Sequence, residues 1–144
     1  MKLLLTVVLS IFSLTSFAQP GGGNSKSGDS CFIFIYRGGQ LTGSLANWTI
    51  YVDEQKLCKL SNNRYIQVPV KPGKHQVTAK LSGVSVMKKE TEVEIDAEPG
   101  GSYYVACNVK QSITRARLEM IEVTKSTGTK QMENMSMDNC ETKE

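Results

Sequence analysis

The residues best suited to hold a metal ion lie near the C-terminus. Three methionines and one cysteine follow one another at short intervals: Met132, Met135, Met137 and Cys140. Thioether and thiolate sulfurs are soft ligands that suit Cu(I). Because the chain has no second methionine block and no histidine beside these residues, we expect no metal site, and Cu(I) binding by these four side chains is the alternative interpretation.

The single histidine, His75, is the one candidate for a general base. A serine or cysteine hydrolase needs such a base beside its nucleophile, and no G-x-S-x-G motif accompanies it. His75 follows a turn and shares one face of a predicted strand with Val77 and Ala79. We therefore expect a half-buried histidine whose ring is held by a backbone carbonyl, and a protein without catalytic residues or a cofactor.

A run of acidic residues alternates with apolar ones: Glu90, Glu92, Glu94, Asp96 and Glu98. Alternation places such side chains on one face of a strand. Oxygen ligands of this kind suit calcium, but no D-x-D-x-D-G loop shapes a cage for the ion. We interpret the acids as a solvated outer face.

The N-terminal residues indicate export. Lys2 precedes an apolar run over residues 3–14, and the small residues Ser16 and Ala18 follow. This order of charge, apolar run and small residues is typical of a secretory signal peptide, here cleaved between Ala18 and Gln19. Residues 19–30 are rich in Gly and Ser and predict a flexible leader.

Composition narrows the class of protein. Removal of Lys2 with the signal segment lowers the formal net charge from +3 to +2, so we expect no nucleic-acid partner. The mature chain has no apolar run near the ~20 residues that a membrane span needs. The first cysteine, Cys31, lies too far from the apolar run to accept a lipid. We expect a secreted or periplasmic protein without a lipid anchor.

The four cysteines survive signal cleavage, and an even count in an oxidising compartment suggests two disulfides. Of the three possible pairings we favour Cys58–Cys107, which would join two strand interiors, with Cys31–Cys140, which would join the two ends of the domain. One disulfide with two buried thiols is the alternative. No C-x-x-C motif supports a zinc knuckle or a thioredoxin-type site.

The distribution of apolar residues predicts an all-β protein. Short runs with period-two alternation, separated by turns, indicate about seven strands over residues 31–123 in a single antiparallel β-sandwich. Residues 31–36 are apolar on both faces and predict a central strand. The basic outer face of residues 74–80 would complement the acidic face of residues 90–96 if the two strands pair. Residues 124–144 are polar and predict a disordered tail.

Three motifs resemble a known family. They are a strand ending in Tyr36-Arg37, a strand that runs through Pro72-Gly73 into His75, and the turn Pro99-Gly100-Gly101 before Tyr103-Tyr104-Val105. Together they resemble domain of unknown function 2846, found in secreted proteins and lipoproteins of bacteria, and the Pro-Gly-x-His turn is similar to that of PEGA-type surface domains. The resemblance implies a transthyretin-like (prealbumin-like) sandwich, and no functional residues.

These observations together predict a binding or structural module of the cell envelope that is not an enzyme. Its partner would be a protein or a glycan of the envelope. A periplasmic Cu(I)-handling protein is the alternative function.

Overall fold

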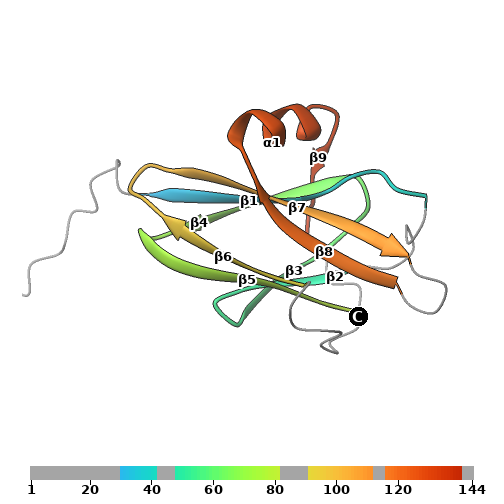
Figure 1. The fold of residues 1–144 in the computed structure, drawn as a ribbon, viewed down its shortest axis with the longest axis horizontal. Coiled ribbons are helices and arrows are strands. Elements are labelled where there is room, and N and C mark those ends of the chain that lie inside the picture. The colour runs from blue at the N-terminus through green and yellow to red at the C-terminus, as the bar shows by residue number, and fades with distance from the viewer. Residues whose placement is uncertain (1–29, 42–47, 82–90, 112–115, 141–144) are drawn as a thin grey trace, which may run out of the picture.

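The computed structural model describes residues 30–41, 48–81, 91–111 and 116–140. The predicted signal peptide, its Ala18–Gln19 bond and the leader up to residue 29 lie outside these residues. Two sheets pack face to face (Figure 1), one of five strands in the order β8-β7-β1-β4-β9 and one of four in the order β3-β2-β5-β6. The prediction of an all-β sandwich is therefore confirmed.

The described residues form nine strands and one helix. They are β1 (Cys31–Arg37), β2 (Trp48–Val52), β3 (Gln55–Leu60), β4 (Arg64–Val70), β5 (Gly73–Leu81), β6 (Glu92–Ala97), β7 (Ser102–Gln111), β8 (Ala116–Val123), α1 (Lys125–Met132) and β9 (Ser136–Met137). Among the described residues, no helix is long and apolar enough to cross a membrane.

Strand β1 is covered on both faces, as its sequence predicts. Ile33 and Ile35 are fully buried in the main core between the sheets. Phe34 and Tyr36 belong to a second apolar cluster on the outer face, where α1 lies over the five-stranded sheet (Figure 1). A residue run that is apolar at every position therefore fills two packing layers.

The sandwich is mixed and not wholly antiparallel. β1 pairs in parallel with β7, from Phe32 opposite Ser102 to Arg37 opposite Cys107. β9 also runs parallel to β4. A parallel pair requires a long crossover, and here the chain between β1 and β7 forms β4 and the whole four-stranded sheet.

The β2–β3 hairpin has a two-residue turn. Val52 pairs with Gln55, and the intervening Asp53 and Glu54 both have positive φ, at 49° and 66°. This is the geometry of a type I′ turn, whose twist matches that of the flanking strands. The turn projects the Asp53 carboxylate toward β5.

The basic strand and the acidic strand pair with each other, which was the condition for their outer faces to be complementary. β5 and β6 are antiparallel neighbours. The Lys74 Nζ lies 2.9 Å from a Glu94 carboxylate oxygen, and the Gln76 Nε2 donates to Glu92 at 2.6 Å. These cross-strand contacts complement charges at the solvated face.

The prediction of a disordered tail is wrong for residues 124–140. Thr124 begins α1, and its hydroxyl accepts a hydrogen bond from the Thr127 backbone N–H. Ser136 and Met137 then pair with Arg64 and Tyr65 of β4. The apolar pattern of this segment is weak, so its sequence did not predict order. Its order comes from contacts with the sheet. We call residues 124–140 the C-terminal strap.

Candidate functional site

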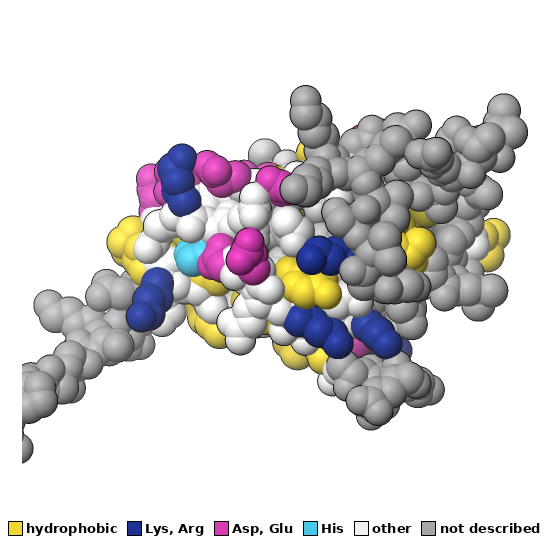
Figure 2. All heavy atoms as spheres, turned by 90° about the horizontal axis from the view of Figure 1, so that it is seen from below, with side chains coloured by type: hydrophobic (Ala, Val, Ile, Leu, Met, Phe, Trp, Pro, Cys, Tyr) yellow, Lys and Arg dark blue, Asp and Glu magenta, His cyan; other side chains and the backbone are white. Residues whose placement is uncertain are grey.

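The outer face of the four-stranded sheet carries charges of both signs. Pairing places the following side chains on this face, which we call the bipolar face: Lys56, Lys59, Tyr51, Lys74, Gln76, Thr78, Lys80, Glu92, Glu94 and Asp96. Figure 2 looks onto this face, where acidic side chains gather along one side and most basic ones along the other. The gradient follows the strand order, with lysines on β3 and acids on β6.

An open hollow of about 650 Å³ lies in the middle of the bipolar face. Polar side chains dominate its lining: Tyr51, Glu54, Gln76, Thr78, Lys80 and Glu92. The Lys80 ammonium lies 4.5 Å from the centre of the Tyr51 ring, a cation–π contact that holds both side chains over the sheet. Hydroxyl, amide, ammonium and carboxylate groups converge here, so the hollow suits a polar partner.

His75 lies beside the bipolar face (cyan in Figure 2), with both ring nitrogens engaged. Nδ1 lies 2.7 Å from an Asp53 carboxylate oxygen, and Nε2 lies 2.7 Å from the Lys71 carbonyl oxygen. The second Asp53 oxygen accepts from the Gln76 backbone N–H at 2.9 Å. The predicted contact of His75 with a backbone carbonyl is confirmed. The contact with Asp53 was not predicted, because the β2–β3 turn reaches β5 only in the folded protein.

The environment favours the charged forms of His75 and Asp53. The hydrogen bond to Asp53 raises the pKa of His75 against the opposing effect of burial, with help from the Lys71 carbonyl. Burial acts to raise the pKa of Asp53, but hydrogen bonds from His75 and Gln76 outweigh it and leave that pKa lowered. Nδ1 faces the Asp53 carboxylate and Nε2 faces the Lys71 carbonyl, so the ring clamps the β2–β3 turn to β5 and both nitrogens are occupied by contacts within the protein.

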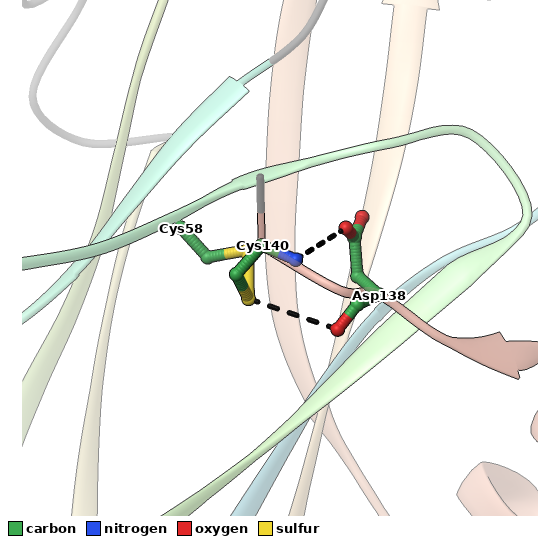
Figure 3. A group of neighbouring side chains, drawn as sticks. All are labelled: Cys58, Asp138 and Cys140. Atoms are coloured by element: carbon green, nitrogen blue, oxygen red, sulfur yellow. Dashed lines mark hydrogen bonds between the residues drawn. A yellow bond between two sulfur atoms is a disulfide. The ribbon is translucent and has the colours of Figure 1, made fainter. Parts of the chain in front are cut away.

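One disulfide joins the C-terminal strap to the sandwich (Figure 3). Cys58 of β3 is bonded to Cys140, with their Cα atoms 5.0 Å apart. Asp138 lies beside the bond: one carboxylate oxygen accepts from the Cys140 N–H at 3.0 Å, and the other accepts from the Ser61 N–H at 2.8 Å. Covalent and hydrogen bonds therefore fix the strap at the same place.

Both favoured cysteine pairings are wrong. Cys140 reaches Cys58 because β9 carries the chain past the β3–β4 turn, a path that a disordered tail would not take. The Cys31 Sγ lies at the start of β1 and donates to the Glu98 carbonyl at 2.9 Å. Cys107 is fully buried on β7, and burial raises the pKa of its thiol to about 12 despite the charge of Arg37. The alternative of one disulfide and two buried thiols is confirmed.

The four residues of the Cu(I) alternative lie in three different surroundings. Met132 and Met135 pack against the second apolar cluster on the outer face of the five-stranded sheet, whereas Cys140 packs against the main core. Met137 is exposed to solvent. Met132 and Met135 are therefore packed in an apolar cluster that does not include Cys140.

One trio has the composition of a metal site. Across the described ranges, Cys58, Asp138 and Cys140 form the only group of three His, Cys, Asp or Glu with ligand atoms within 4.8 Å of one another. Two thiolates and a carboxylate would suit Zn²⁺, but in the disulfide neither sulfur is a thiolate. The trio is therefore a structural link in this state. Of the acids predicted on one face, Glu92, Glu94 and Asp96 are exposed on β6, and Glu90 lies outside the described residues.

Fold and site together define a small β-sandwich domain whose C-terminal strap is fastened by a disulfide. The chain belongs to the family described as "Protein of unknown function (DUF2846)", whose family model matches residues 27–119. The resemblance of the three motifs is thereby confirmed. No curated protein matches the chain. The matched residues end within β8, so the C-terminal strap and Cys140 lie beyond them.

Proposed function

We propose that this protein is an exported binding module of the cell envelope, without catalytic activity, and that it receives its partner on the bipolar face. The hollow at Tyr51 carries the proposal, because it gathers hydrogen-bonding and charged groups on an exposed face of the sheet. The engaged nitrogens of His75 support the absence of catalysis, since a general base needs an accessible lone pair.

Export is supported by the link between Cys58 and Cys140. Disulfides persist in oxidising compartments and are rare where thiols are kept reduced. This link agrees with the signal-peptide pattern that ends at Ala18. A secreted or periplasmic location is therefore part of the proposal.

A protein is the partner that the bipolar face fits best. Lysines on β3 and acids on β6 form a gradient that a partner of opposite gradient would match in one orientation. An envelope glycan would instead use the hydroxyl and amide groups near Thr78 and Gln76. The two partners are distinguished by the product of cross-linking.

The test is site-specific photo-cross-linking in intact cells of the native host. A photoreactive residue replaces Thr78 in the hollow, and the matched control replaces Lys110, which is exposed on β7 in the other sheet. We expect a discrete, protease-sensitive adduct from position 78 and none from position 110. Equal labelling from both positions, or no adduct from position 78, would contradict binding on the bipolar face.

Export is tested by intact mass. Protein recovered from the host envelope or medium should have the mass of residues 19–144 less two hydrogens, because one disulfide forms. Retention of residues 1–18 in protein found only in the cytoplasm would contradict the proposed location.

A further inference from the structure

The C-terminal strap covers an aromatic surface on the five-stranded sheet. Four side chains from three neighbouring strands make up this surface, which we call the aromatic face: Phe34, Tyr36, Tyr65 and Tyr104. The rings of Phe34 and Tyr104 stack with their centres 4.9 Å apart. Figure 1 shows α1 lying across this side of the sheet. Without the strap, these rings would form an exposed apolar surface of the kind that marks binding sites.

The strap is seated by few contacts. Gly128 packs directly on the Tyr104 ring, and the Tyr36 hydroxyl donates to the Gln131 side chain at 2.5 Å. Met132 and Met135 pack at the margin of the same cluster. Beyond α1, β9 adds pairing with only two residues of β4.

Helix α1 has little stability of its own. It is eight residues long, includes Gly128, and has no acidic residue in its first turn. Isolated helices shorter than about 12 residues are marginal in water, and a helical glycine costs about 1 kcal/mol relative to alanine. The helix is therefore formed by its contact with the aromatic face.

The link at the far end of the strap holds it in place. One residue separates β8 from α1, so the chain itself holds the N-terminal end of the strap. The Cys58–Cys140 bond holds the other end, which limits how far α1 can move away and so raises its effective concentration over the aromatic face. Asp138 fixes the same end without a covalent bond, because its carboxylate accepts from the Ser61 backbone N–H between β3 and β4. Loss of the disulfide would leave this end attached only by the hydrogen bond from Ser61 to Asp138 and by the short pairing of β9 with β4.

We propose that the C-terminal strap is a releasable cover, locked by Cys58–Cys140, over a surface that binds an amphipathic helix of a partner protein. We infer a helical partner because the element that covers the aromatic face in this structure, α1, is itself a helix. Gly128, Gln131 and Met132 contact the aromatic face at positions i, i+3 and i+4. A partner helix with a small residue at the first of these positions can approach Tyr104 as closely.

Release requires a dithiol reductant from outside the protein. Its thiolate attacks the Sγ of Cys140, the more exposed of the two residues, and the electron pair of the broken bond leaves on Cys58. The second thiol of the reductant then attacks the mixed disulfide. The reductant ends as a disulfide, and two protons complete the thiols of Cys58 and Cys140.

The aromatic face is a different surface from the bipolar face, because the two lie on the outer faces of opposite sheets. Binding of a partner helix to the aromatic face is therefore independent of binding on the bipolar face. It also assigns a role to residues that lie after the family match.

The first test is hydrogen–deuterium exchange on the full chain, oxidised, reduced with dithiothreitol, and as Cys140→Ser. We expect at least tenfold faster exchange over residues 125–132 in the reduced and variant proteins, with unchanged exchange in β5 and β6. Unchanged exchange in α1 would overturn the proposal, and so would a parallel loss of protection in β5 and β6, because the cover would then be inseparable from the sandwich.

The second test measures binding in trans with a labelled peptide of residues 124–137. The receiving protein is the full chain with Gly128→Leu and Cys140→Ser, whose own helix cannot seat. We expect the peptide to bind this variant at least tenfold more tightly than it binds the oxidised wild type, and a Gly128→Leu peptide to lose binding. Equal affinity for both proteins, or no binding to the variant, would overturn the proposal.

Discussion

The backbone of Gly128 in α1 packs directly against the side chain of Tyr104 on β7. A Cβ atom built on Gly128 would lie 2.5 Å from the Cγ and 2.6 Å from the Cβ of Tyr104, distances that real atoms do not adopt. Tyr104 is itself held by its stacking on Phe34. The absence of a side chain at position 128 therefore lets the helix dock.

We predict that Gly128→Ala destabilises the docked helix. Alanine favours a helix over glycine by about 1 kcal/mol, but overpacking against a fixed ring costs about 1–3 kcal/mol. We expect a net loss of about 1 kcal/mol in urea unfolding, with faster hydrogen exchange over residues 125–132. The control is Ser126→Ala on the exposed side of the same helix, and equal stability of the two variants would contradict the packing argument.

The Pro99-Gly100-Gly101 turn depends on a second close approach. Gly100 has φ of 74°, and the Gly101 N–H donates to the Glu98 carbonyl at 2.9 Å, as in a type II turn with proline at its second position. The Tyr103 hydroxyl folds back and accepts from the Glu98 N–H at 2.7 Å. Gly101 lies inside this arrangement.

We predict that Gly101→Ala lowers the free energy of unfolding by about 2–3 kcal/mol, since the new methyl group would overlap its surroundings. It would lie 2.7 Å from the Tyr103 ring and 2.9 Å from the Glu98 carbonyl oxygen. Gly38→Ala is the matched control, because nothing lies within 4 Å of its Cβ position. Chemical denaturation measures the free energy of unfolding of both variants. If Gly38→Ala lowers this free energy as much as Gly101→Ala does, the argument from steric overlap is contradicted.

Local patterns in the sequence predicted the features that neighbouring residues determine. The alternation in residues 74–81 and 90–96 was sufficient for β5, β6 and their charge pairing, because strand faces follow a period of two. The apolar character of both faces of residues 31–36 likewise indicated the central position of β1.

Contacts between distant residues could not be predicted in this way. The polar strap is ordered by its contact with Tyr104 and by its disulfide to Cys58. The composition of the strap does not reveal either of these partners, because both lie far away in the sequence. Tyr104 lies on the outer face of β7 and is nevertheless buried, because α1 covers it. The Asp53–His75 contact likewise depends on a hairpin turn and the next strand meeting in space.

We predict that two cysteines react with an alkylating agent when the oxidised protein is denatured without reduction. These are Cys31 and Cys107, whereas Cys58 and Cys140 are protected by their bond. In the native protein Cys107 should react very slowly, because burial raises its pKa to about 12 and the thiolate is the reactive form. Peptide mapping by mass spectrometry identifies the labelled residues, and a Cys58–Cys107 cross-linked peptide would contradict the structure.

We predict that His75 makes stability depend on pH. Because folding raises the pKa of His75 above its ordinary 6.5, its contribution is fully present below pH 6.5 and is lost as pH rises through the folded value. The lowered pKa of Asp53 means that its contribution is present above its ordinary 3.8 and is lost as pH falls through its folded value. The pair therefore stabilises the fold most between these limits.

The comparison of wild type with His75→Gln tests this pH dependence. Since Asp53 is half exposed, solvent screening limits the pair to about 1 kcal/mol. We expect the thermal midpoint of the variant to fall furthest below that of wild type at pH 5.5 and to approach it by pH 9. Asp53→Asn removes the charge that raises the pKa of His75, so this variant should lose most of the pH dependence. A gap between wild type and His75→Gln that stays constant from pH 5.5 to 9 would show that the ring acts through packing and not through its charge.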